Sequence, residues 1–196
     1  MSLEAQITFL KELDALKQVI RQTILADKSR RENTAEHSWH VAMAAMTLAP
    51  HADAPVDTMH VVKMLLVHDI VEIDAGDTYA YDELGYEDKL EREQAAAKRL
   101  FGILPEEQGT EFRELWEEFE AAESEDAKFA GAIDQLMPFL HNIWSDGESW
   151  RKHRPPYEVV FARNQERVGG GSTELWAYVE RLFEKVLAEG WLEKSE

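Results

Sequence analysis

The chain has 196 residues, 44% of them hydrophobic and 31% charged, which is enough apolar material for one soluble domain with a sizeable core. Its formal net charge of −18 repels phosphate backbones and anionic lipid, which argues against nucleic-acid polymers and membrane surfaces as partners. The absence of cysteine excludes disulfides, thiolate zinc sites and a cysteine nucleophile, and it fits a reducing cytoplasm.

The first residues, MSLEAQITFLKELDAL, predict no secretory signal, because they contain neither a basic segment nor a long apolar one. No stretch of the sequence approaches 18 uninterrupted apolar residues, so no membrane-spanning helix is expected.

Apolar residues recur at three- and four-residue steps through the first 24 positions and predict one amphipathic helix there. They are Ile7, Leu10, Leu13, Leu16, Ile20 and Ile24. The polar stretch DKSRREN then interrupts the pattern. Asn33 followed by Glu36 resembles a capping box, which predicts a second helix from about residue 35 to 49, ending near Pro50.

The rest of the chain also has helical periodicity. Helices are expected over about residues 57–73, 87–101, 105–121 and 124–144, then a short one from Pro155–Pro156 and a last one capped by the GGGS run. The stretch AGDTYAYDELGY is rich in turn residues, and we find no strand pattern of useful length. The sequence therefore predicts an all-α bundle of about seven to nine helices. A single domain would cover residues 1–196, with a core at about 30–145 and the terminal helices packed on it.

The stretch MLLVHDIVEID is unusual because a His–Asp pair interrupts an apolar run. Helical spacing places His68, Asp69 and Glu72 on one face, opposite an apolar face. An unpaired buried carboxylate costs several kcal/mol. A salt bridge to Asp69 or a hydrogen-bonded core histidine at position 68 would be structural explanations. A divalent cation would account for the whole cluster, since it neutralises carboxylates and binds neutral imidazole.

A metal ion needs further ligands, and other helices offer candidates. His37 lies in the first turn of the second predicted helix, in TAEHSWHVAMAAM. Asp134 lies in the middle of FAGAIDQLMPFLHNIW and repeats the oddity of Asp69, an acid within an apolar stripe. Two imidazoles and two carboxylates would leave open positions on a six-coordinate ion. Spacing alone does not select these residues from the others of their kind.

Three stretches together resemble the HD-domain superfamily of metal-dependent phosphohydrolases: RRENTAEHSWHVA, MLLVHDIVEIDAGDT and GAIDQLMPFLHN. The ordered signature H…HD…D corresponds to His37, His68–Asp69 and Asp134. The second stretch is similar to the HDxxExxxGD pattern of the subgroup that contains the 5′-deoxynucleotidases and HD-domain-containing protein 2. The resemblance covers about residues 5–190.

The resemblance implies an all-α fold and hydrolysis of a nucleotide phosphate monoester by a metal-activated water. His37, His68, Asp69 and Asp134 would hold one divalent ion, which would be Mn, Co or Mg, or Zn, Ni or Fe in the protein as isolated. Glu72 would handle protons or orient water, and Asp77 would be a second acid near the phosphate. Relatives often form dimers, so a cytoplasmic homodimer acting on a small-molecule nucleotide is expected.

One departure concerns the phosphate. The bacterial deoxynucleotidases have an Arg–Trp pair upstream of the first ligand histidine, whereas here Gln22 follows Arg21. Residues 11–31 contain six basic and three acidic side chains, a local excess of positive charge in an acidic protein. Phosphate binding is therefore assigned to Arg21, Lys28, Arg30 or Arg31, although a solvated helix face would have a similar composition.

The function predicted from the sequence is a nucleotidase that acts on (deoxy)nucleoside 5′-monophosphates. The alternatives are an HD-type phosphodiesterase, a nucleoside polyphosphate hydrolase, and a non-catalytic metal protein that binds a nucleotide. Bimetallic phosphodiesterases use extra histidines between the HD pair and the last aspartate, and residues 70–133 contain none. Glu72 and Asp77 favour catalysis, because a purely structural ion does not need two spare acids beside it.

Overall fold

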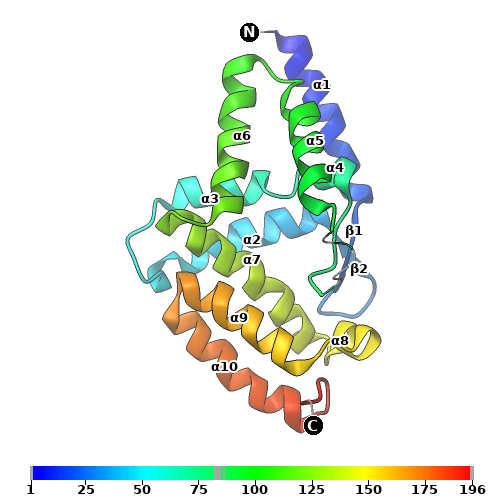
Figure 1. Ribbon diagram of the computed structural model, residues 1–196, viewed down its shortest axis with the longest axis vertical. Coiled ribbons are helices and arrows are strands. Elements are labelled where there is room, and N and C mark those ends of the chain that lie inside the picture. The colour runs from blue at the N-terminus through cyan, green and yellow to red at the C-terminus, as the bar shows by residue number, and fades with distance from the viewer. Residues whose placement is uncertain (1, 82–84, 86, 195–196) are drawn as a thin grey trace.

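The computed structural model describes residues 2–81, 85 and 87–194 and shows the predicted all-α architecture (Figure 1). Its helices are α1 (Leu3–Leu13), α2 (Thr34–Leu48), α3 (Thr58–Val67), α4 (Glu72–Ala75), α5 (Lys89–Phe101), α6 (Glu106–Ala121), α7 (Glu125–Trp144), α8 (Glu148–His153), α9 (Tyr157–Gly171) and α10 (Thr173–Ala188). Short 3₁₀ segments cover Asp14–Gln18 and Ala49–His51, and two short strands are β1 (Ile20–Ile24) and β2 (Arg31–Asn33).

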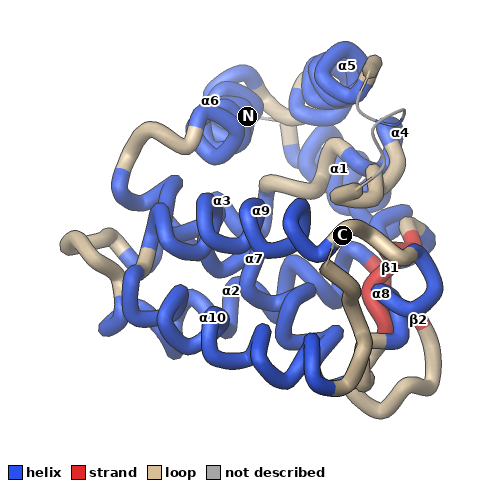
Figure 2. Tube along the Cα trace, turned by 60° about the horizontal axis from the view of Figure 1, so that its bottom comes forward, coloured by secondary structure: helices blue, strands red, loops and turns tan. Residues whose placement is uncertain are grey.

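Helix α7 forms the centre of the bundle. It packs against α9 on one side and against α2 and α3 on the other, and α10 covers α9 (Figures 1 and 2). Its buried residues include Phe129, Ile133 and Leu136, each at most 1% exposed. At the end of α9, a Cβ on Gly171 would lie 2.5 Å from the Lys128 carbonyl oxygen. Only glycine therefore allows α9 to approach α7 so closely, and the GGGS run is helical packing rather than a linker.

The predicted helix starts are confirmed where a capping side chain was visible in the sequence. Asn33 accepts from the Glu36 backbone N–H while the Glu36 side chain accepts from the Asn33 N–H, the reciprocal pair of a capping box. Ser124 and Ser172 cap α7 and α10 in the same way, by accepting from Ala127 N–H and Leu175 N–H.

Three expectations about the elements were wrong. The first helix ends at Leu13, and Ile20–Ile24 is a strand paired antiparallel with Arg31–Asn33. The third helix ends at Val67, because from there the chain tightens into turns with bonds such as Glu72 N–H to Asp69 C=O. The segment between residue 144 and Pro155, for which no helix was predicted, contains α8.

Some of the expected irregular stretch over residues 75–86 lies outside the described residues. Within the described part, residues 76–81 contain no helix or strand. No helix among the described residues has both the length and the apolar character needed to cross a lipid bilayer.

Candidate metal centre and active site

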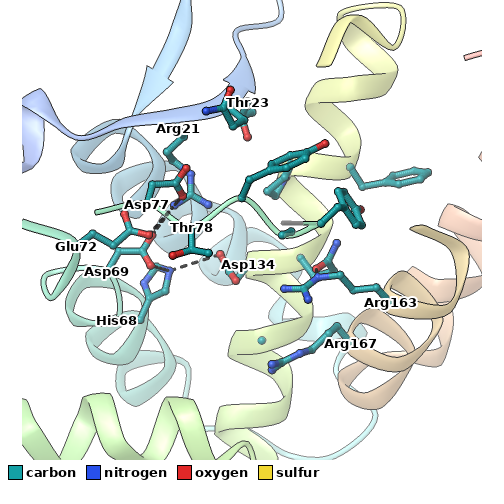
Figure 3. A pocket seen from close by; sticks show the side chains of 18 of the residues that line it. Arg21, Thr23, His68, Asp69, Glu72, Asp77, Thr78, Asp134, Arg163 and Arg167 are labelled. Carbon is teal, nitrogen blue, oxygen red and sulfur yellow. Dashed lines mark hydrogen bonds and ion pairs between the residues drawn. The ribbon is translucent and has the colours of Figure 1, made fainter. Parts of the chain in front are cut away.

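A cavity of about 390 Å³ opens where the end of α3, the turn before α4, and residues 76–81 face α7 and α9 (Figure 3). The predicted residues Arg21, His68, Asp69, Glu72, Asp77 and Asp134 all line this cavity. They come from β1, the α3–α4 turn, the first residue of α4, the segment after α4, and α7. The fold therefore brings together residues that are up to 113 positions apart in the sequence.

The four predicted metal ligands converge on one point. His37 Nε2 lies 2.9 Å from Asp134 Oδ1 and 3.7 Å from Asp69 Oδ2. His68 Nε2 lies 3.1 Å from Asp69 Oδ1 and 3.5 Å from Asp134 Oδ1. Ligands bound at about 2.1 Å to one divalent ion are separated by roughly 3.0–3.5 Å, so the spacing fits a shared ion.

The orientation of the two imidazoles also fits a metal. His68 Nδ1 donates to the Leu65 carbonyl oxygen at 2.8 Å, which leaves its Nε2 as the nitrogen that faces the carboxylates. That Nε2 is buried without a hydrogen-bond partner. His37 turns its Nδ1 toward Glu32 Oε2 at 3.5 Å and its Nε2 toward Asp134. In both histidines the outer nitrogen faces an oxygen atom and the inner nitrogen faces the carboxylates, an orientation that is typical of metal-bound histidine.

The charges around this point are strongly coupled. Burial opposes ionisation of Asp69, but His68 and Arg21 hold the pKa of this carboxyl well below its usual range. Burial likewise opposes ionisation of Asp134, but His37, which is hydrogen-bonded to this carboxyl, and the neighbouring His68 together lower its pKa. Both carboxylates are therefore ionised at neutral pH. Imidazole protons and Arg21 supply the compensating positive charge, and a divalent ion would take the place of the imidazole protons.

Glu72 and Asp77 form the second acid layer of the cavity. Glu72 Oε2 accepts from Thr34 Oγ1 at 2.8 Å, and burial together with the Asp69 charge raises its pKa well above the usual value. Burial also raises the pKa of Asp77. A carboxyl group whose pKa is raised toward neutrality can donate as well as accept a proton near pH 7, as general acid–base catalysis requires.

Only one of the four predicted phosphate-binding residues lines the cavity. Arg21 is 13% exposed, and its Nη1 lies 2.7 Å from Asp69, 3.8 Å from Glu72 and 3.7 Å from Asp77. Lys28 instead pairs with Asp146, Arg30 pairs with Glu36, and Arg31 Nη1 donates to Gln22 Oε1 at 3.3 Å. Of these partners, Gln22 lines the cavity.

Sequence reasoning missed two arginines on the far wall. Arg163 and Arg167 are one turn apart on α9 and line the cavity opposite Asp134 and His68 (Figure 3). Arg163 Nε donates to Gln135 Oε1 at 3.0 Å, and Gln135 donates to the buried Asn164. Among the described residues Arg167 has no ion-pair partner. The run RNQER resembles a solvated helix face, so nothing in it indicates a site.

Comparison with known proteins agrees with this geometry. A family profile described as "HD domain" matches residues 13–176. The solved structure of a predicted metal-dependent phosphohydrolase from Magnetospirillum magnetotacticum MS-1 is 49% identical, with a TM-score of 0.92, and the match covers 97% of this chain and 95% of that one. The 5′-deoxynucleotidase of Erwinia tasmaniensis is 30% identical over 81% of this chain and 85% of its own length.

The human 5′-deoxynucleotidase HDDC2 is 34% identical over 135 residues, which are 68% of this chain. The match covers 65% of the human protein, so this chain spans slightly less than two thirds of that relative. The profile and the relatives together show that the chain belongs to the HD-domain family.

Proposed function

We propose that this HD-domain protein is a metal-dependent phosphohydrolase that releases phosphate from nucleoside or deoxynucleoside 5′-monophosphates. One observation carries the proposal. The buried Nε2 of His68, which makes no hydrogen bond, points at two ionised carboxylates, beside two further acids and an arginine in an open cavity. The names of the relatives, phosphohydrolase and 5′-deoxynucleotidase, support the same chemistry.

His37, His68, Asp69 and Asp134 would hold one divalent ion, with Mn²⁺, Co²⁺ or Mg²⁺ as the candidates for the active protein and Zn²⁺, Ni²⁺ or Fe for the protein as isolated. When bound, the ion supplies Lewis acidity and lowers the pKa of water, as in other metal-dependent hydrolases. An ion with open positions is compatible with this ligand set of two imidazoles and two carboxylates.

The remaining residues handle protons and charge. Glu72, with its raised pKa, is the group we assign to proton transfer, either from the attacking water or to the leaving oxygen. Asp77 is the second acid near the phosphate. We assign a phosphate oxygen to Arg21, because it lines the cavity, whereas Lys28, Arg30 and Arg31 do not. Phosphate binding by Lys28, Arg30 or Arg31 stays a prediction.

The nucleoside would lie between the acids and α9. Arg167, which has no ion pair among the described residues, and Arg163, held by Gln135, supply donors on that wall. Gln22 occupies the position where the bacterial enzymes have tryptophan, and it lines the cavity next to Arg21. An amide there offers hydrogen bonds to a sugar hydroxyl instead of a stacking surface.

Several finer points belong to the same proposal. We propose a homodimer located in the cytoplasm, with residues 1–196 as one domain. An apolar stripe on α1 supports a dimer: Leu3, Ile7 and Leu10 are 71%, 57% and 59% exposed. Light scattering of the purified protein measures the oligomeric state directly.

The test is phosphate release from paired ribo- and deoxyribonucleoside monophosphates by protein loaded with Mn²⁺ or Co²⁺. We expect release by the native protein, and at least a 1,000-fold lower kcat for Asp69→Asn. His51→Gln is the matched control, because His51 pairs with Glu174 away from the cavity. Tight nucleotide binding without phosphate release would instead indicate a non-catalytic nucleotide-binding protein. Release from cyclic dinucleotides or nucleoside polyphosphates in preference to monophosphates would indicate one of the other hydrolase classes.

A further inference from the structure

A second group of metal-ligating side chains lies beside the first. Glu32, His40 and His141 each offer one ligand atom, and the three atoms lie within 4.8 Å of one another. They come from β2, α2 and α7. A separate pocket of about 300 Å³ opens onto them, with Trp39 and Trp144 among its lining residues. None of these five residues lines the active-site cavity.

In this group, Nε2 of His141 faces Nδ1 of His40. His141 Nδ1 contacts the Ile24 carbonyl oxygen at 3.1 Å, so it carries the proton, and its Nε2 presents a lone pair. That Nε2 lies 3.4 Å from His40 Nδ1. An ordinary N–H hydrogen bond is about 2.9–3.0 Å, whereas two nitrogens bound to one tetrahedral Zn²⁺ are roughly 3.3–3.4 Å apart. A backbone carbonyl that fixes the outer nitrogen is also the usual support of a metal-bound histidine.

The carboxylate of Glu32 completes the set. Its side chain is only 3% exposed. Its basic contacts are His37 Nδ1 at 3.5 Å and Arg21 Nε at 3.9 Å, both longer than the 2.7–2.9 Å typical of a charge-assisted hydrogen bond. Arg21 Nε itself has no hydrogen-bond partner. Neither contact is as close as a charge-assisted hydrogen bond, so an ion between this buried carboxylate and the two histidines would add a closer counter-charge.

We propose that Glu32, His40 and His141 form a second metal site, specific for imidazole-binding transition metals such as Zn²⁺, Co²⁺, Ni²⁺ or Cu²⁺. Two imidazoles and one carboxylate select these ions over Mg²⁺ and Ca²⁺, which bind oxygen ligands. Three protein ligands leave a fourth position open toward the pocket beside Trp39 and Trp144, where water or an added ligand binds. The Glu32 carboxylate has to approach the histidines by at most about 1.5 Å to reach bonding distance.

Glu32 would connect this site to the active site. One of its oxygens lies 3.5 Å from Nδ1 of His37, which is a ligand of the first centre. An ion bound by Glu32 would withdraw negative charge from that imidazole and so weaken metal binding at the first site. By thermodynamic reciprocity, occupancy of the first site would weaken the second by the same factor.

The test counts zinc ions per chain, so it does not depend on phosphate release. Metal-free protein is dialysed against buffered Zn²⁺ at low micromolar free concentration, and bound zinc is measured by mass spectrometry. We expect two ions in the native protein and one in His40→Gln, because loss of a direct ligand weakens that site by at least about 100-fold. Asp69→Asn, which disables the first site, should retain the ion that His40→Gln loses. His51→Gln, a histidine outside both clusters, should keep two.

A second readout locates the ion. Cu²⁺ quenches tryptophan fluorescence at short range, and Trp39 and Trp144 line the proposed pocket. We expect quenching in Asp69→Asn that is abolished by adding His40→Gln. His40→Ala provides a second removal of the ligand, and thermal unfolding checks that both variants fold. One zinc per native chain, or two in folded His40→Gln and His40→Ala, would overturn the proposal. If the native protein binds two zinc ions but releases no phosphate, the proposed function is wrong and the second metal site is unaffected.

Discussion

Arg21 is a cation that contacts three acids of the cavity wall. Its Nη1 lies 2.7 Å from Asp69 and within 3.8 Å of Glu72 and Asp77. At an effective dielectric constant of 20, each full charge pair at about 4 Å is worth about 4 kcal/mol. The three contributions do not add, because carboxyl groups that lose their counter-charge take up protons. Removing one partner of a buried pair typically costs 3–5 kcal/mol.

We therefore predict that Arg21→Gln lowers the free energy of unfolding of the metal-free protein by about 3–5 kcal/mol at pH 8. Burial raises the pKa of Glu72 and Asp77, so the folded state binds more protons than the unfolded state above their ordinary pKa. Stability then falls as pH rises, and the loss in the variant should be smaller at pH 5 than at pH 8. Saturating Mn²⁺ should restore part of it, since the ion neutralises the same carboxylates.

Urea unfolding of metal-free protein at the two pH values measures both numbers. Arg21→Lys is the matched control, because it retains the charge but not the planar guanidinium, and it should keep most of the stability while losing phosphate affinity. A loss below about 0.5 kcal/mol for Arg21→Gln at pH 8 would refute the reasoning, because Arg21 would then not be the counter-charge of the cluster.

Three further predictions concern catalysis, the metal and the sugar. Glu72→Gln should lower kcat by about 100- to 10,000-fold with the metal content unchanged. If the variant and the native protein have equal kcat values, Glu72 does not transfer the proton. Burial lowers the pKa of His37 and His68, but their carboxylate partners raise it overall, so binding of Mn²⁺ must displace protons. Between pH 6 and 8, calorimetry should show the affinity for Mn²⁺ rising about tenfold per pH unit for each proton that the ion displaces. A pH-independent affinity would contradict this displacement of protons. Gln22→Trp should raise the ratio of kcat/KM for deoxyribonucleotides to kcat/KM for ribonucleotides. An unchanged ratio would mean that the sugar does not lie beside residue 22.

Local signals in the sequence were sufficient where the structure depends on neighbouring residues. Asn33, Ser124 and Ser172 each cap a helix through contacts three residues away, so their role could be predicted from the printed sequence. The helix predicted over Ile20 and Ile24 was wrong for the opposite reason. A four-residue spacing of apolar side chains fits a helix and also one face of a strand, and the pairing with residues 31–33 that decides between them is not local.

The same limit applies to the candidate site. His68 and Asp69 were noticed because a polar pair in an apolar run is costly, but no glycine or proline marks the end of α3 at Val67. The tightened turn still keeps His68, Asp69 and Glu72 on the cavity wall, so the predicted common face is present without the continuous helix. Arg163 lacked any such signal, because its role follows from the packing of α9 against α7.

The charge arrangement explains how this cluster can be kept in a folded protein before a metal arrives. Asp69 and Asp134 stay ionised because protons on His37 and His68, together with Arg21, compensate them. A divalent ion held by His37 and His68 would take the place of protons on these imidazoles, whereas Arg21 has no proton to give up at physiological pH. Among these three described side chains, Arg21 is therefore the one that is positively charged in both states. That permanence supports the proposal that Arg21 holds a substrate phosphate, because a neutral side chain there would leave the surrounding carboxylates to repel the anion.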